Sequence, residues 1–221
     1  MSLKVRETPS PNFNDRKRPL SLIVLHYTGM ESGAAALARM CDPDVSVSAH
    51  YMVEEDGTVC RLVAEEKRAW HAGVSSWRGE RDVNSASVGI EIVNGGHDFG
   101  LPDFPGVQVD AVTELVRDIM GRHGIVPRDV IGHSDVAPGR KTDPGETFPW
   151  PRLAGAGAAL ALPDARADGE PEALLERIGY GLEPGLDAVV EAFQRRWRPG
   201  RVDGVLDGET RDLIARVASA A

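Results

Sequence analysis

Two short apolar runs, residues 20–26 and 87–93, constrain the fold of this chain more than any other feature of its sequence. The first run is followed by a Thr-Gly pair and predicts a buried strand whose last residue, His26, reaches a loop. The second run predicts another apolar strand, which carries a single acidic residue, Glu91. The end of a buried strand is a good place for a ligand, so His26 is the first candidate for a functional site.

The segments between and after these runs show helix and strand patterns in turn. Residues 34–40 predict a helix, and the two runs on either side of the Glu-Asp-Gly turn at 55–57 predict a hairpin. Apolar positions in residues 109–123 recur at helical spacing, Gly124 fits the C-cap of that helix, and residues 125–131 lead into a short strand. This order predicts an α/β (mixed) fold with a central mixed β-sheet flanked by helices.

A change of composition divides the chain into two units. Residues 153–171 consist mostly of Ala, Gly, Pro and Asp, and they predict a short helical stretch followed by a linker. Three amphipathic helices are predicted after it, over residues 172–178, 186–197 and 207–217. We therefore expect three parts, which are a larger domain over residues 1–155, a linker over 156–170 and a small all-α domain over 171–221.

Net charge and cysteine count narrow the classes of function. The 34 acidic and 25 basic residues give a formal charge of −9, which argues against binding to nucleic acid or to anionic membrane surfaces. No stretch of the sequence approaches the ~20 apolar residues of a membrane-spanning helix, so we expect no transmembrane segment. Two cysteines are too few for a disulfide framework or a four-cysteine zinc site. A metal site in this chain must therefore consist of histidine and carboxylate.

His26, His133 and Asp143 are the strongest candidates for such a site. A lone histidine beside a strand end or a glycine is more often a hydrogen-bonding residue than a metal ligand. Asp143, however, adds a carboxylate to the same Gly- and Pro-rich loop that follows His133. Catalytic zinc takes three protein ligands of these types and leaves a fourth position open, whereas a closed structural site requires a fourth ligand. The set of three therefore favours a catalytic ion.

Two charged residues, Glu91 and Lys141, suit hydrolysis at such an ion. Glu91 has apolar neighbours in its strand, and a partly desolvated carboxylate with a raised pKa can take a proton from water and pass it to a leaving nitrogen. The alternative is an edge strand that directs Glu91 to solvent. On a locally extended backbone Lys141 would face the same way as Asp143 and stabilise an oxyanion; the alternative is a solvated surface lysine.

The same residues lie in six motifs that together resemble the type 2 N-acetylmuramoyl-L-alanine amidases. The motifs, found between residues 9 and 151, are Val-Leu-His-Tyr-Thr, Val-Ser-Ala-His-Tyr, Ala-Trp-His-Ala-Gly-Val-Ser, Gly-Ile-Glu-Ile, Gly-His-Ser-Asp and Arg-Lys-Thr-Asp-Pro-Gly. The resemblance implies a hydrolase that cleaves the amide bond between the N-acetylmuramoyl or anhydromuramoyl lactyl group and L-alanine of peptidoglycan or muropeptides. It also implies Zn2+ on His26, His133 and Asp143, with Glu91 as the catalytic acid/base and Lys141 as its electrostatic helper.

The resemblance further implies a set of substrate contacts. His71 and Ala72, in the His-Ala-Gly motif, would line the groove that binds the peptide, and Trp70 would add a wall to it. Arg81 and Asn84 lie in the loop that contacts substrate in the family. We therefore expect these five residues to surround the metal site.

The C-terminal unit and the cellular location leave alternatives open. Residues 186–211 resemble the three-helix peptidoglycan-binding module, which either binds the cell wall or only packs on the catalytic domain. The module favours the cell envelope (periplasm) and the absence of an export leader favours the cytoplasm; we expect the envelope, and a monomer. A non-catalytic peptidoglycan-recognition protein of the same fold is the alternative function. Such a binder is expected to lose a ligand or the catalytic carboxylate, and this chain has the complete set.

Overall fold

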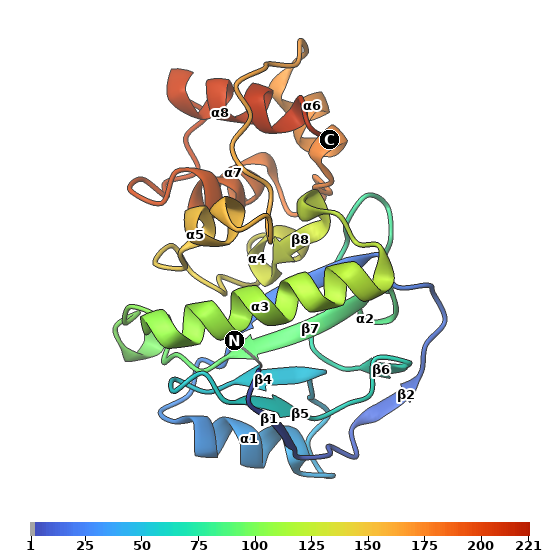
Figure 1. The fold of residues 1–221 in the computed structure, drawn as a ribbon. Helices are drawn as coiled ribbons and strands as arrows, with labels where there is room; N and C mark the ends of the chain where they lie inside the picture. Colours follow the sequence, from blue (N-terminus) through green and yellow to red (C-terminus); the bar gives the residue numbers. More distant parts are fainter. Residues whose placement is uncertain (1–2) are drawn as a thin grey trace.

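The computed structural model describes residues 3–221 and contains a six-stranded mixed β-sheet (Figure 1). The two apolar runs form β3 and β7, which are adjacent parallel strands in the interior of the sheet. Within this sheet only the hairpin pair β4 and β5 is antiparallel. The strand order is β1 (Val5–Glu7), β5 (Val59–Arg61), β4 (Tyr51–Val53), β7 (Ser87–Ile92), β3 (Leu22–Tyr27) and β8 (Val130–Gly132).

The alternation of side chains along β3 and β7 determines which face of the sheet carries the polar residues. Ile23 and Leu25 point to the face that helix α3 (Gly106–His123) covers, and they belong to the apolar core beneath that helix. His26 and Glu91 are paired in register on the two strands, so both side chains lie on the opposite face. Because β7 lies between β4 and β3, the edge-strand alternative for Glu91 is wrong.

Most of the predicted elements are present with nearly the predicted ends. The predicted helix at 34–40 is α1 (Gly33–Cys41), and α3 ends before Gly124, whose left-handed backbone (φ 67°) caps the helix. The hairpin joins β4 and β5 as expected. Sequence patterns did not predict β1 or several other short elements, which are β2 (Phe13–Asp15), β6 (Lys67–Ala69), α2 (Val83–Ala86), α4 (His133–Val136) and the 3-10 helices η1 (His97–Phe99) and η2 (Pro127–Asp129). The predicted short helical stretch near residue 153 is α5 (Trp150–Gly155).

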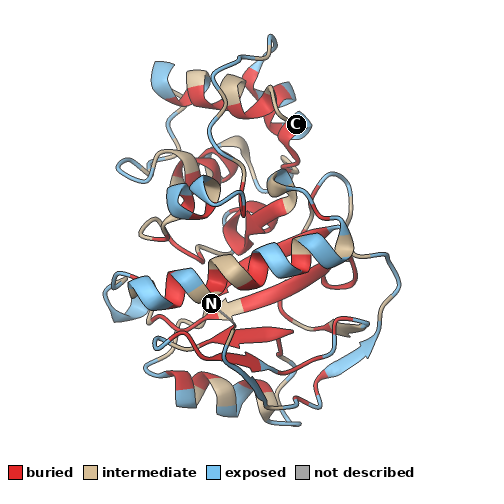
Figure 2. Cartoon of the chain, in the orientation of Figure 1, coloured by how far each residue is buried: buried red, intermediate tan, exposed pale blue. Residues whose placement is uncertain are grey.

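The three helices predicted near the C-terminus are present and lie beyond the edge strand β8, at the opposite end of the sheet from α1 (Figure 1). Their bounds are α6 (Pro171–Ile178), α7 (Leu186–Trp197) and α8 (Gly208–Ala218). Buried side chains of these helices, such as Phe193 and Ile214, belong to one apolar cluster with Val24 and Val136 of the larger unit. Figure 2 shows buried positions on both sides of the junction, so a continuous core joins the two units.

Residues 156–170 lack regular secondary structure but are held against α8. The N–H of Ala167 donates to the carbonyl of Ala215 (2.9 Å), and the guanidinium of Arg166 lies 2.5 Å from the carboxylate of Asp212. Composition predicted a flexible tether here, and the structure differs because backbone and charged groups of the segment find partners on the helix. The division of the chain into domains at residues 155 and 171 remains a prediction.

Candidate metal centre and active site

Three buried ligand atoms meet at the carboxyl ends of β3 and β8. His26 lies near the end of β3, and His133 is the first residue of α4, directly after β8. Since the two strands are parallel neighbours, their ends bring these histidines together, and Asp143 comes from the loop after α4. The two Nδ1 atoms are 2.9 Å apart, and each is 3.0 Å from Oδ2 of Asp143. The three residues predicted as ligands are thus in one cluster.

A chain of hydrogen bonds fixes the proton on His26. The hydroxyl of Ser87 donates to the carbonyl of Val83 (2.6 Å), so its oxygen accepts from Nε2–H of His71 (3.3 Å). Nδ1 of His71 is then an acceptor, and it accepts a hydrogen bond from Nε2–H of His26 (3.0 Å). This order leaves Nδ1 of His26 without a proton, and its lone pair faces Asp143.

The tautomer of His133 is fixed by a backbone carbonyl. Nε2 of His133 lies 3.0 Å from the oxygen of Ala72, and because a carbonyl only accepts, this nitrogen carries the proton. In the neutral ring, which is the form that binds a metal, Nδ1 of His133 then presents a lone pair beside Oδ2 of Asp143. Three electron-pair donors face one another with no proton between them, and a cation is the group that satisfies all three.

The donor set fits a zinc ion. Burial and the neighbouring His133 lower the pKa of His26 to about 4, so His26 is neutral near pH 7. Burial alone would raise the pKa of Asp143, but the adjacent histidines outweigh it and lower that pKa below its usual range. Two imidazoles and one carboxylate, with ligand atoms within 4.8 Å of one another, are the ligand types of catalytic zinc.

Glu91 lies beside this cluster on the neighbouring strand. Its Oε2 is buried and has no hydrogen-bond partner among residues 3–221. Burial first, and then the negative charge of Asp143, raise the pKa of Glu91 well above its ordinary value, whereas the ammonium of Lys141 opposes this rise. Glu91 is one of the residues that line a hollow of about 210 Å³, together with Met30 and Met40. The half-buried Lys141 is close enough to act on both Glu91 and His26.

His71, Ala72 and Asn84, predicted to contact substrate, are hydrogen-bonded to one another and to the candidate ligands His26 and His133. His71 is 6% exposed, and both of its ring nitrogens are engaged by His26 and Ser87. Oδ1 of the buried Asn84 accepts from the backbone N–H groups of His71 (3.0 Å) and Ala72 (2.8 Å). These bonds hold the segment that contacts His26 and His133, and a contact of these three residues with substrate stays a prediction.

The structure places Trp70 and Arg81 outside the ligand cluster. The indole N–H of Trp70 donates to Oδ1 of Asn14 on β2 (3.1 Å). Arg81 forms an exposed ion pair with Glu183 (2.7 Å) and lines a hollow of about 220 Å³ that Arg140 also lines. The residues that line this hollow do not include His26, His133 or Asp143, so a contact of Trp70 or Arg81 with substrate stays a prediction.

Sequence reasoning missed two residues that organise the site. The guanidinium of Arg140 donates to the carbonyls of Ala72 and Val74 (both 2.6 Å), and Ser87 begins the chain of hydrogen bonds to His26. Arg140 stands next to Lys141 in a motif that already pointed to the site. Ser87 lies four residues before Glu91, and the two-residue period of a strand places both on the same face.

Comparison with known proteins agrees with this geometry. Residues 16–146 match the family model described as N-acetylmuramoyl-L-alanine amidase. The amidase AmiD of Escherichia coli is 35% identical over 226 residues, which cover 88% of this chain and 80% of AmiD. The crystal structure of AmpDh3 from Pseudomonas aeruginosa matches with a TM-score of 0.83 and 32% identity over 92% of each chain.

A further structure, E. coli AmiD in complex with the substrate anhydro-N-acetylmuramic acid-L-Ala-D-gamma-Glu-L-Lys, matches with a TM-score of 0.81 and 30% identity. The match covers 95% of this chain and 98% of that one. The likeness therefore includes the mixed sheet, the helices that flank it and the C-terminal helices. With its family model, its sequence relative and its fold in agreement, the chain belongs to the N-acetylmuramoyl-L-alanine amidases.

Proposed function

We propose that this amidase is zinc-dependent and that His26, His133 and Asp143 hold the metal. The observation that carries the proposal is the cluster of two imidazole Nδ1 atoms and one carboxylate oxygen, all buried and 2.9–3.0 Å apart. When bound, zinc supplies Lewis acidity at an open coordination position. Every proton transfer is then left to the side chains of the chain itself.

In this proposal Glu91 is the acid/base. It accepts a proton from the attacking water while the water oxygen bonds to the lactyl carbonyl carbon, and it delivers that proton to the nitrogen of L-alanine as the C–N bond breaks. The raised pKa of Glu91, caused first by burial, suits a group that must both take and return a proton near neutral pH. The ammonium of Lys141 balances the negative charge that develops on the carbonyl oxygen.

The proposed substrate is the bond between the N-acetylmuramoyl or anhydromuramoyl lactyl group and L-alanine, in peptidoglycan or in muropeptides. The AmiD complex with an anhydromuramoyl tripeptide supports the muropeptide part of this proposal. Glu91 lines a hollow of about 210 Å³, which offers space beside the proposed acid/base, and Arg140, which contacts Ala72, lines another of about 220 Å³. A non-catalytic binder is disfavoured because the three ligands, Glu91 and Lys141 are all present.

We further propose that residues 1–155 form the catalytic domain, that 156–170 connect it to 171–221, and that the C-terminal unit is related to peptidoglycan-binding modules. The proposal places a monomer in the cell envelope, and the alternative location is the cytoplasm. None of the helices within residues 3–221 is long and apolar enough to cross a membrane.

A cleavage assay with matched metal analysis tests the proposed function. We expect the protein to release a peptide with a free L-alanine amino group from a soluble muropeptide, and to contain about one zinc per chain. Removing the metal with a chelator should abolish release, and adding Zn2+ should restore it. Full activity of a verified metal-free protein would contradict the role of zinc, and no cleavage by a zinc-loaded protein would contradict the proposed reaction.

A further inference from the structure

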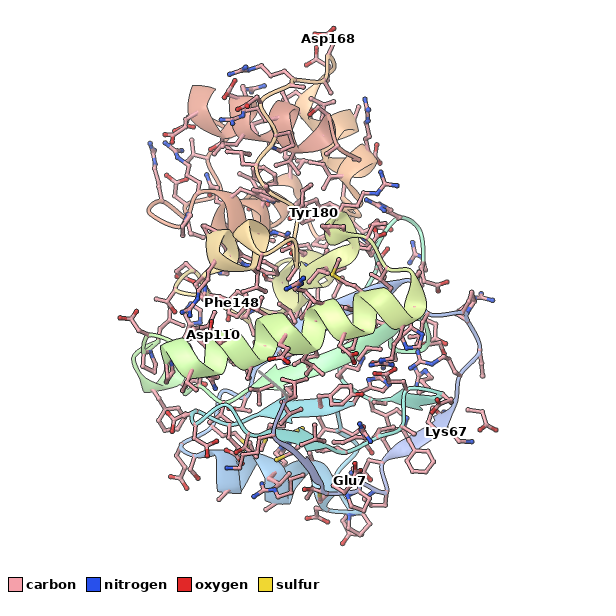
Figure 3. The ribbon with its side chains drawn as sticks, in the orientation of Figure 1. Glu7, Lys67, Asp110, Phe148, Asp168 and Tyr180 are labelled. Atoms are coloured by element: carbon pink, nitrogen blue, oxygen red, sulfur yellow. The ribbon has the colours of Figure 1, made fainter. Side chains whose placement is uncertain are left out.

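Asp135 is a buried carboxylate, 1% exposed, two residues after the metal-site histidine His133 on α4. Its Oδ2 accepts from the backbone N–H of Gly132 (2.8 Å), which closes the first turn of that short helix. Its Oδ1 accepts from the hydroxyl of Tyr180 (2.5 Å), a residue that follows α6 in the C-terminal unit. Figure 3 shows Tyr180 at the junction of the two units.

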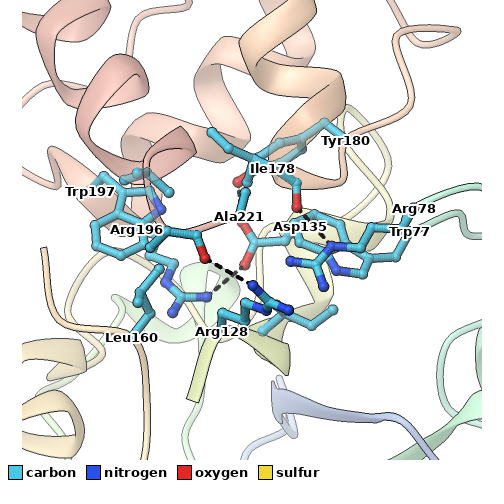
Figure 4. Close-up of a pocket in the computed structure, with 13 residues that line it drawn as sticks. Trp77, Arg78, Arg128, Asp135, Leu160, Ile178, Tyr180, Arg196, Trp197 and Ala221 are labelled. Atoms are coloured by element: carbon cyan, nitrogen blue, oxygen red, sulfur yellow. Dashed lines mark hydrogen bonds and ion pairs between the residues drawn. The ribbon is translucent and has the colours of Figure 1, made fainter. Parts of the chain in front are cut away.

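A second buried group from the C-terminal unit reaches the same carboxylate. The guanidinium of Arg196, on α7, lies 3.5 Å from Oδ2 of Asp135 and donates to the carbonyl of Val130 on β8 (3.0 Å). Its plane covers the ring of Trp150 at 3.9 Å. In Figure 4 Asp135 lies between side chains of the C-terminal helices and side chains of the larger unit. One cation therefore touches both the strand before His133 and the helix that contains it.

Helix α7 also borders the loop that carries Asp143. The guanidinium of Arg195 lies 3.4 Å from the carboxylate of Glu146. Gly139 is packed so closely on α7 that a Cβ there would lie 3.2 Å from the Cβ of Ala188. Both ends of the segment from His133 to Glu146 are thus held by residues beyond 170.

A four-residue helix cannot maintain its own geometry, because isolated helices of this length are unstable in water. A metal site, in contrast, requires its ligands to stay within about 0.5 Å of the working geometry. The contacts that hold α4 in place are the buried bonds to Asp135 and the apolar cluster shared with α7.

We propose that the C-terminal helices position the metal ligand His133, and that Tyr180 and Arg196 act as positioning residues through Asp135. The inference rests on the proposed zinc site. It assigns the C-terminal unit a role in metal binding and turnover on any substrate, including one too small to need a wall-binding module.

A pair of tyrosine variants tests this inference. Tyr51 offers a matched control, because its buried hydroxyl donates to a carboxylate oxygen of Glu65 at 2.6 Å on the α3 face of the sheet. Both Tyr180→Phe and Tyr51→Phe remove one buried hydroxyl–carboxylate bond, so both should lower the melting temperature. Only Tyr180→Phe should weaken Zn2+ affinity, by about tenfold or more in competition with a chelator. It should also lower kcat on a soluble muropeptide with little change in KM.

The visible absorption spectrum of bound Co2+ is a second measurement, because it reports the geometry of the metal ligands and does not change when only the stability of the fold is lowered. It should change in Tyr180→Phe and stay as in the wild type in Tyr51→Phe. If Tyr180→Phe does not fold, Arg196→Lys replaces it, with Arg198→Lys as control, because Arg198 pairs with Asp207 inside the C-terminal unit. Equal metal affinity and equal Co2+ spectra in variant and control would overturn the inference alone. Absence of zinc binding by the wild-type protein would overturn both the inference and the proposed metal.

Discussion

At the scale of single residues, the position of a few protons decides what the histidine cluster can bind. The hydroxyl of Ser87 donates to a backbone carbonyl, so its oxygen accepts from His71. His71 in turn accepts from Nε2–H of His26, which fixes the tautomer of His26. The carbonyl of Ala72 accepts from Nε2–H of His133 and so places the proton of the neutral ring on Nε2. Had either histidine carried its proton on Nδ1, a hydrogen bond to Asp143 would satisfy the cluster without a metal. The tautomers therefore separate a metal site from an ordinary buried hydrogen-bond network.

Replacing Glu91 by glutamine tests the proton transfer directly. An amide cannot accept a proton from water, so Glu91→Gln should keep its zinc and its fold and lose about 10²–10⁴-fold in kcat. Zinc content, melting temperature and muropeptide turnover of the variant are to be measured together. A variant with normal zinc and near-normal turnover would remove Glu91 from the mechanism.

The sequence was sufficient to predict the residues that meet at the candidate site but not the residues that hydrogen-bond to them. His26, His133, Asp143 and Glu91 stand in short motifs whose order along the chain is specific. The supporting role of His71 depends on a contact with Ser87 sixteen positions away, which neither composition nor periodicity encodes. Motifs therefore identify ligands more reliably than the contacts that fix their protons.

At the scale of elements, close packing of β7 against the His-Ala-Gly segment fixes His71. Gly89 is the residue that permits it, because a Cβ at this position would lie 2.4 Å from Cγ of the His71 ring. Gly89→Ala should therefore displace the ring, break its bond to His26 and weaken zinc affinity by about tenfold or more. A chelator competition assay measures this effect.

Gly121→Ala is the matched control for that substitution. A Cβ built at Gly121, inside α3, would meet no atom within 4 Å among residues 3–221, apart from its chain neighbours and the backbone of its own helix. Alanine there should raise stability by up to about 1 kcal/mol and leave zinc binding unchanged. Equal zinc affinity in Gly89→Ala and Gly121→Ala would show that the position of the His71 ring does not control the metal site.

A second contact between elements links α3 to the hairpin and predicts how stability depends on pH. Burial alone would raise the pKa of Glu65, but hydrogen bonds from Arg122, Tyr51 and His123 outweigh it and lower the pKa to about 2. With an unfolded value near 4.5, this group contributes roughly 3 kcal/mol of stability above pH 4.5. The contribution is lost as the pH falls from about 4.5 to about 2.

The variant Glu65→Gln lacks this titration, so its free energy of unfolding should depend less on pH than that of the wild type in this range. Urea unfolding at pH 7, 4.5 and 3 measures the difference between the two proteins. The gap should be largest at pH 7 and shrink toward pH 3. A gap that is constant with pH would show that the ionised carboxylate is not the source of the stability.

Element prediction failed where the elements are short. β1, β2, β6 and α4 have three or four residues each, which is too few for a period of 2 or 3.6 to be recognised. Their conformation comes from pairing with distant segments, as β1 pairs with β5 and β2 with β6. Longer runs such as α3 and β7 were predicted because their own apolar pattern specifies a buried face.

At the scale of the whole molecule, the chain is held by a core that crosses the boundary suggested by its composition. Trp77 and Val136 of the larger unit pack in the same cluster as Leu175 and Phe193 of the C-terminal helices. Composition detects the polar, Ala- and Gly-rich connection, but it does not show that the helices after it return to cover the sheet. Two models of the C-terminal unit follow, an independent wall anchor and an integral part of the catalytic fold.

Deleting residues 156–221 separates these models. Uncovering several large apolar side chains, each worth roughly 1.5–3 kcal/mol when buried, should cost about 5 kcal/mol or more. For a protein of this size the melting temperature should then fall by roughly 10–20 °C. Because Asp135 would lose both Tyr180 and Arg196, turnover of a small soluble muropeptide should fall with it. Calorimetry and a soluble-substrate assay on the truncated and full-length proteins measure both effects.

Adding residues 156–221 as a separate peptide provides the control for that deletion. If the truncated protein loses stability and turnover because its apolar surface is exposed, the peptide should bind that surface. The melting temperature and turnover of the truncated protein should then rise toward those of the full-length chain, since a ligand that binds only the folded state stabilises it. An independent anchor predicts a different result, because tethering raises the effective substrate concentration without affecting the chemistry. In that case the truncated protein would keep its melting temperature and its soluble turnover, and it would lose only its sedimentation with insoluble peptidoglycan. Equal sedimentation of both proteins would exclude the anchor.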